Sequence, residues 1–247
     1  MGIDYVLDVD CTAKQRLTVE GIVNMVKARS RADMIIAMAR QQGDERPPSQ
    51  ITFGVVINRM GNLERQEVSA QQLLDQAAAL DEYRDDCARC SANRENPSGY
   101  GCYDAINYPL EPDAEKWLLS RLPTKLESAA GYMFKSAMED FGWDGAQAAK
   151  MRAQGETFFR LREPPVRMWP GLTITGDQLF HMMFHVGHLS PMHAKMMCLF
   201  LGLLVIGEED EEPVEAAPES DNGEQVIRFI NALAYAASEQ VNVLIDG

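Results

Sequence analysis

The sequence has no long hydrophobic run, and this absence excludes the simplest membrane architecture. Its longest apolar stretch, residues 196–207, is shorter than the roughly 20 apolar residues that a membrane-spanning helix needs. Asp4, Asp8 and Asp10 interrupt the first ten residues, where an export signal would require a basic start and an apolar core. We therefore expect a cytoplasmic protein that does not associate with membranes.

Residue types that build common catalytic sites are also scarce. The 247 residues include five cysteines and four histidines, and five cysteines without an export signal argue against a disulfide framework. The motifs of phosphate-binding loops, dinucleotide-binding turns, zinc proteases and serine-nucleophile elbows are absent. The sequence therefore offers no recognisable catalytic constellation.

Positive charge is in the minority, with 23 lysines and arginines against 37 aspartates and glutamates, a net charge of −14. A field of this sign repels phosphate backbones and anionic lipid surfaces. We expect another protein as the partner, and neither nucleic acid nor a membrane. The most basic stretch is interpreted as a solvated helix face; its charged residues are Lys14, Arg16, Lys27, Arg29, Arg31 and Arg40.

The chain begins with the pattern of a strand followed by a helix. Apolar residues alternate with polar ones over residues 3–10, which predicts a half-buried strand. Residues 13–42 then carry apolar side chains at helical spacing. Gly21 and Ser30 weaken the centre of this stretch, so that one long helix and two shorter helices are both compatible with it.

A hairpin and a capped helix are predicted next. Residues 51–58 and 63–68 have strand composition and flank the turn sequence Met60-Gly61-Asn62. Ser69 follows, and Gln72 three residues later completes a capping box, which predicts a helix that begins there.

The second half of the chain is dominated by helix-start signals. These signals are a proline at the first helical position or a polar capping residue, and they occur at Pro112, Thr124, Asp144, Thr175 and Ser190. The prolines of residues 162–170 predict an irregular connection. Residues 225–243 have the apolar periodicity of a final amphipathic helix.

These patterns together predict an α+β fold, with a small, mostly antiparallel sheet, helices and a metal-pinned loop, followed by a largely helical C-terminal half. We expect an α+β region over residues 1–123 and a helical region over 124–207. An acidic, proline-bearing linker is expected over 208–224, and the C-terminal helix over 225–247.

Three of the five cysteines lie in residues 85–112, a stretch with little periodicity. Cys87 and Cys90 form a C-x-x-C pair, and Cys102 follows a Gly-Tyr-Gly segment. Two thiolates three residues apart can face one ion across a tight turn. A loop of this length is unusual within a domain unless something pins it, and the pattern therefore predicts a metal site.

Cys11 is the expected fourth ligand, because it follows the first strand, whose end could meet the loop. Four thiolates favour structural zinc, which needs no open coordination position. A [4Fe–4S] cluster is the alternative, since a group of three cysteines plus a distant one also suits it. A redox dithiol fits less well, because this C-x-x-C pair follows a helix instead of opening one. Cys198, within an apolar helix, is interpreted as a core residue.

A second candidate site lies among the histidines, all four of which fall within thirteen residues. The first three have the spacing of one helix face and could bind a metal, and the neighbouring methionines would suit copper. The competing interpretation is a buried or interface helix, since no acidic residue lies among them. The residues are His181, His185, His188 and His193.

Residues 8–12, Asp-Val-Asp-Cys-Thr at the end of a strand, resemble the first motif of haloacid-dehalogenase-type phosphatases. The resemblance implies that Asp8 is a nucleophile, that Asp10 is an acid/base and that the strand before them is a central parallel one. Residues 203–210 resemble the last acidic motif of that family, with Glu208 in place of its usual aspartate.

The leading hypothesis is an intracellular binding or adaptor protein that is stabilised by a metal and has no catalytic site. One alternative is a metalloenzyme or metal-handling protein that uses the histidines. The other is a phosphatase that uses Asp8 and Asp10.

Overall fold

Helices mixed with small antiparallel sheets confirm the predicted α+β class. The computed structural model describes residues 2–59, 62–93, 100, 102–140, 164–184, 188–206, 216 and 218–246. The chain divides into unit 1, residues 1–9 and 103–247, and unit 2, residues 10–102. This division falls at other positions than the predicted boundaries after residues 123, 207 and 224.

A three-stranded antiparallel sheet organises unit 1, with β1 (Gly2–Leu7) between β4 (Tyr103–Asn107) and β7 (Val243–Asp246). The first predicted strand is confirmed, but it is buried on both faces instead of one. The Asp4 carboxylate, 8% exposed, accepts a hydrogen bond from the Tyr103 hydroxyl, which offsets the cost of its burial. β4 corrects the prediction of a continuous loop over residues 85–112.

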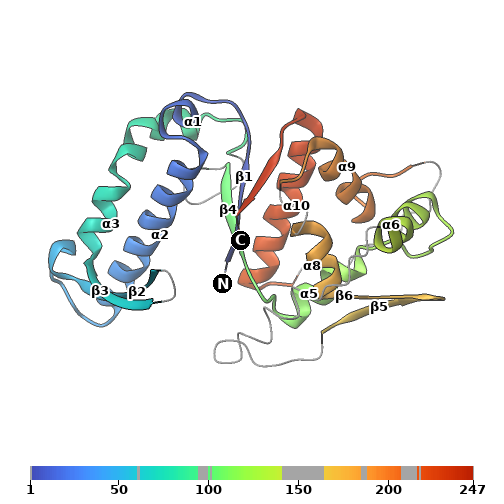
Figure 1. The fold of residues 1–247 in the computed structure, drawn as a ribbon, viewed down its shortest axis with the longest axis horizontal. Coiled ribbons are helices and arrows are strands. Elements are labelled where there is room, and N and C mark those ends of the chain that lie inside the picture. Colours follow the sequence, from blue (N-terminus) through green and yellow to red (C-terminus); the bar gives the residue numbers. More distant parts are fainter. Residues whose placement is uncertain are drawn as a thin grey trace. The chain divides into compact units, whose positions relative to one another are not determined.

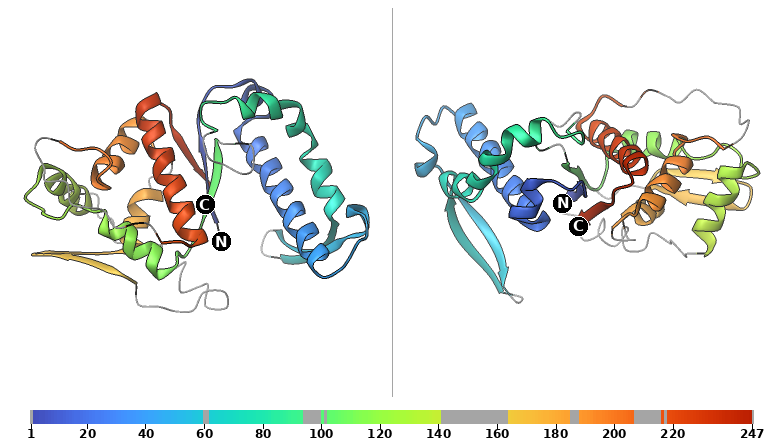
Figure 2. Two further views of the ribbon diagram at one scale, coloured as in Figure 1. Left: turned by 180° about the vertical axis from the view of Figure 1, so that it is seen from behind. Right: turned by 90° about the horizontal axis from the view of Figure 1, so that it is seen from above.

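Helix α10 (Asp221–Glu239) packs beside this sheet, as Figures 1 and 2 show. The buried ring of Phe229 lies 5.0 Å from that of Tyr5 on β1. Arg228 forms an ion pair with Asp104 of β4 at 2.6 Å. The helix begins four residues before the predicted start at 225, so the predicted linker 208–224 ends too late.

Four further helices and one hairpin complete the described part of unit 1. A hairpin pairs residues 166–169 with 172–175, so the prediction of an irregular connection over residues 162–170 is wrong for residues 166–169. Gly171, with a φ of 83°, makes its turn. The elements are α5 (Pro112–Ser120), α6 (Ala129–Asp140), β5 (Val166–Trp169), β6 (Leu172–Thr175), α8 (Gly176–Phe184) and α9 (Pro191–Phe200).

The helix-start predictions of unit 1 have mixed outcomes. Thr175 caps α8 by accepting from the Gln178 amide at 3.1 Å, and Ser190 caps α9, as predicted. The prediction at Thr124 is wrong, because α6 starts at Ala129 and the hydroxyl of Ser128 caps it. The predicted start at Asp144 lies outside the described residues.

Among the helices described, none is both long and apolar enough to cross a membrane.

Unit 2 confirms the predicted hairpin and capped helix. The hairpin pairs residues from Thr52↔Ser69 to Arg59↔Asn62, and Ser69 and Gln72 form the capping box. The elements are α1 (Thr12–Leu17), α2 (Val19–Gln41), η1 (Pro48–Gln50), β2 (Thr52–Arg59), β3 (Asn62–Ser69), α3 (Ala70–Gln76), η2 (Ala78–Tyr83) and α4 (Arg84–Ala88).

The stretch predicted as helical over residues 13–42 divides at Thr18, and at neither Gly21 nor Ser30. Thr18 has a φ of 61°, which few residues other than glycine adopt, and its hydroxyl accepts from the Gly21 amide at 3.1 Å. The α2 helix that starts there lies beside α3 (Figure 1), and the guanidinium of Arg29 on α2 binds Asp81 at 2.9 Å.

Candidate metal centre

Cys11 is the residue that precedes α1. Its backbone is extended, with φ −155° and ψ 159°, and its carbonyl accepts from the amide of Gln15 at 3.1 Å. The helix that follows has only six residues, and it places Lys14 one turn after Cys11. The lysine side chain is 8% exposed. The interpretation of the basic stretch as a solvated face is therefore wrong for Lys14.

Cys87 and Cys90 lie on a tight turn that closes α4. The Cys90 amide donates to the Cys87 carbonyl at 3.1 Å, and the side-chain amide of Asn93 donates to the same carbonyl at 3.0 Å. Cys87 lies in the last turn of its helix. This position differs from that of a reactive dithiol, which normally opens a helix and gains acidity there.

Two of the four cysteines predicted as ligands, Cys87 and Cys102, have raised thiol pKa values. Burial raises the pKa of the Cys87 thiol, and the thiols of Cys11 and Cys90 raise it further. Burial also raises the pKa of Cys102 to about 11; Lys14 opposes the rise, while the other three thiols add to it. A raised pKa keeps these two thiols protonated at neutral pH unless a cation such as a metal ion binds the thiolate.

The chain path brings the helix that follows Cys11 close to the segment that leads to Cys87. Helix α1, which follows Cys11, packs against η2, and η2 runs directly into α4, which carries Cys87. Cys102 is the last residue of unit 2, and each of the four thiols is partly exposed. Three segments far apart in the sequence thus carry the four sulfur donors of unit 2.

The donor set matches a closed metal site in its chemistry. Tetrahedral zinc with Zn–S bonds of about 2.3 Å places its sulfurs about 3.8 Å apart. Across the part of the chain that the structure describes, no three histidine, cysteine, aspartate or glutamate side chains form a group already close enough to hold an ion. Cys11, Cys87, Cys90 and Cys102 are among the described residues, and they do not form such a group in this structure.

Two of the three described histidines accept hydrogen bonds from backbone amides. The Nδ1 atom of His188 accepts from the amide of Ile245 at 3.1 Å, and that of His193 accepts from the amide of Ser190 at 3.4 Å. His181 lies on α8, whereas His185 is outside the described residues. The two ring contacts favour a structural role for this segment over the alternative of a metal site.

The two aspartates of the phosphatase resemblance lie in an antiparallel setting. Both neighbours of β1 in the described sheet run antiparallel to it, whereas the resemblance implies a parallel sheet. The Oδ1 atom of Asp10 accepts from the side-chain amide of Gln15 at 2.9 Å, and the Asp8 amide donates to the carbonyl of Asn242 at 2.8 Å. Glu208 lies outside the described residues.

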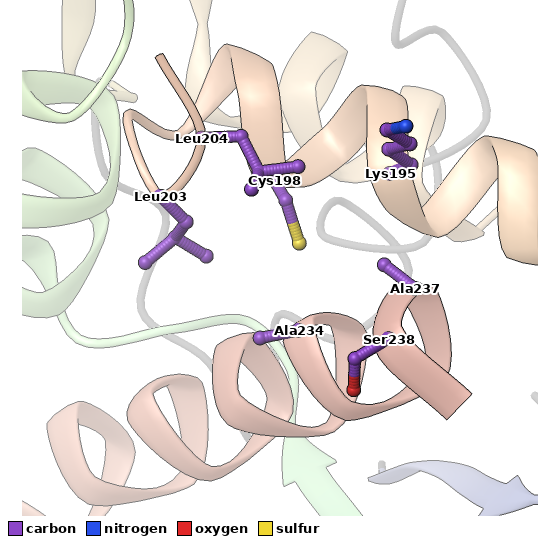
Figure 3. Close-up of a pocket in the computed structure, with 7 residues that line it drawn as sticks. All are labelled: Lys195, Cys198, Leu203, Leu204, Ala234, Ala237 and Ser238. Carbon is purple, nitrogen blue, oxygen red and sulfur yellow. The ribbon is translucent and has the colours of Figure 1, made fainter. Parts of the chain in front are cut away.

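Cys198, the fifth cysteine, belongs to unit 1 and is 1% exposed, which confirms the core interpretation. Figure 3 shows its sulfur pointing into the space between α9 and α10, where an apolar cavity of about 170 Å³ opens. Burial raises the pKa of this thiol to about 11. The residues that line the cavity with it are Lys195, Leu203, Leu204, Ala234, Ala237 and Ser238.

We expect Cys198 to react with iodoacetamide more slowly than Cys11 or Cys90 in the folded, chelator-treated chain. Thiolate is the reactive form, and with a pKa of about 11 it makes up only about one part in ten thousand at pH 7. Raising the pH towards 11 should therefore speed the reaction. Timed alkylation followed by peptide mass spectrometry measures the rates, and faster modification of Cys198 at pH 7 would contradict this reasoning.

Sequence reasoning singled out the four cysteines but did not predict the burial of Lys14. Its position three residues after Cys11 on a short helix was the available signal, because residues at that spacing share a helix face.

Comparison with protein-family models, with curated proteins and with solved structures finds no match to this chain.

Proposed function

We propose that this chain is a binding or adaptor protein whose unit 2 is stabilised by a metal ion held by Cys11, Cys87, Cys90 and Cys102. The observations that support the proposal are the tight turn that carries Cys87 and Cys90 and the presence of all four cysteines, from three separate segments, in unit 2. Zinc is the proposed metal, and a [4Fe–4S] cluster is the alternative. Four sulfur ligands would leave no open position for substrate, which favours a structural role.

Exposed methionines support the binding role. Met34 and Met38 lie one turn apart on α2 and are 56% and 52% exposed. Methionine side chains are flexible and polarisable, and they are common on surfaces that bind other proteins. The acidic net charge of −14 favours a partner with a basic or neutral surface over nucleic acid.

Elemental analysis of the full chain, purified without oxygen, tests the metal proposal. We expect about one zinc per chain and a colourless solution, because zinc has a filled d shell. Iron together with sulfide and a brown colour would indicate that the same ligands hold a [4Fe–4S] cluster instead of zinc. A chain that is metal-free, and stays so after incubation with zinc or with iron and sulfide, would overturn the proposal.

A further inference from the structure

The cavity in unit 1 lies between one face of α9 and one face of α10. Lys195 and Cys198 stand three residues apart on α9 and therefore share a helix face. Ala234, Ala237 and Ser238 have helical spacing on α10, and Figure 3 shows the Cys198 sulfur pointing towards the stretch that carries the two alanines. Because an alanine side chain ends at Cβ, this stretch leaves space that a larger residue would fill.

The turn that ends α9 supplies the third wall of the cavity. Gly202 has a φ of 68°, and this left-handed conformation reverses the chain after the helix. The amides of Leu203 and Leu204 consequently donate to the carbonyl of Cys198, at 2.8 and 3.3 Å. Both leucines line the cavity, and Leu204 is 39% exposed. A solute can therefore enter from this side without separating the two helices.

The volume and the lining of the cavity select the size and the polarity of a ligand. The cavity measures about 170 Å³, and its walls are mostly alanine and leucine side chains. An apolar cavity of about 150 Å³ in another protein stays dry and binds benzene. One aromatic ring therefore fits this space, and the polarisable sulfur of Cys198 offers the ring a favourable contact.

Lys195 adds a positive charge at the edge of these apolar walls. Its side chain lines the cavity and is exposed to solvent, so its ammonium group can pair with an anion that remains partly hydrated. The net charge of −14 repels anions at long range, which makes this local cation decisive for an anionic ligand. Glu239, next to Ser238, is exposed, and water screens its opposing charge.

We propose that the cavity between α9 and α10 binds a small monocyclic aromatic carboxylate, with the ring inside the cavity and the carboxylate paired with Lys195. The inference goes beyond the proposed function, because it assigns a small-molecule ligand to unit 1. It does not depend on a metal, since the four cysteines of the candidate centre belong to unit 2.

Methyl NMR of the full chain, labelled at alanine and leucine, tests the site with benzoate as the probe. We expect the methyl signals of Ala237, Leu203 and Leu204 to shift, with half-saturation on the order of 1 mM, a modest affinity for a single-ring ligand. Benzylamine has the same ring and the opposite charge, and it should bind several-fold more weakly. Benzoate that leaves these methyl signals unchanged would overturn the proposal.

Filling the cavity should prevent binding. Ala237→Leu places a larger side chain in the space for the ring, and we expect benzoate affinity to fall roughly 10-fold or more, because burial of the ring supplies most of the affinity. Ala129→Leu, at an exposed alanine of α6 outside the lining, is the matched control and should bind like the parent. If Ala237→Leu does not fold, Ala234→Leu takes its place. A filled cavity that binds benzoate as the parent does would overturn the site.

Removing the cation should weaken binding of the anionic ligand alone. Lys195→Met should lower benzoate affinity about 2- to 5-fold, the contribution of an exposed ion pair, and leave the affinity for uncharged benzyl alcohol unchanged. Lys116→Met removes the same charge from α5, outside the cavity, and should bind benzoate like the parent. Equal affinities of Lys195→Met and the parent for benzoate would contradict the assignment of a carboxylate ligand.

Discussion

Replacing Cys87 with serine is expected to release the metal and to unfold the cysteine-bearing end of unit 2. A serine hydroxyl stays protonated at neutral pH, so three thiolates would remain for a site that needs four. Structural zinc sites in small folded units have apparent binding free energies on the order of 10–16 kcal/mol, and this energy contributes to folding. Zinc analysis and hydrogen exchange of residues 84–93 measure the two effects.

Cys198→Ala is the matched control for this substitution. It removes a thiol from the core of unit 1, outside the proposed ligand set, and should leave the zinc content unchanged. Unchanged metal content together with unchanged stability in Cys87→Ser would contradict the proposed centre.

Replacing Phe229 with alanine should destabilise unit 1 by about 3–5 kcal/mol, as is typical when a buried aromatic ring is removed. The side chain is 1% exposed, and its ring lies 5.0 Å from Tyr5 and 5.0 Å from Phe184. Its loss would open a cavity between α10, β1 and α8. Urea unfolding followed by tryptophan fluorescence measures the free energy of unfolding.

Two controls make the Phe229 result specific. Glu239→Ala, at the exposed end of the same helix, should change the free energy of unfolding by no more than about 0.5 kcal/mol. The zinc content of Phe229→Ala should match that of the parent, because the proposed ligands lie in unit 2. A loss below about 1 kcal/mol would show that this ring contributes far less than its burial implies.

Local signals in the sequence predicted the local structure. The strand β1, the hairpin of β2 and β3, the capping box at Ser69 and the helix cap at Ser190 each depend on a few neighbouring residues, and all are confirmed. β4 and β7 were not predicted. They have five and four residues, and each is defined by pairing with β1, about a hundred or more residues away in the chain.

The cysteines of the candidate centre could be singled out from the sequence, whereas the burial of Lys14 could not. The spacing of Cys87 and Cys90 is a local pattern, whereas no local pattern relates this pair to Cys11 or Cys102. Lys14 had been assigned to a solvated face, because charged helix residues are normally exposed. Its burial depends on how α1 packs against η2, which no local pattern encodes.

Unit 2 is an insertion in the chain of unit 1, between two strands that pair with each other in one sheet. Val6 of β1 pairs with Tyr103 of β4, so residues 10–102 occupy the place of an ordinary hairpin turn. Closing a loop as long as this inserted segment costs more chain entropy than closing a short turn. Cys11 and Cys102 lie at or next to the two ends of this inserted segment. A metal bound by both would hold these ends together and would thereby favour the pairing of β1 with β4.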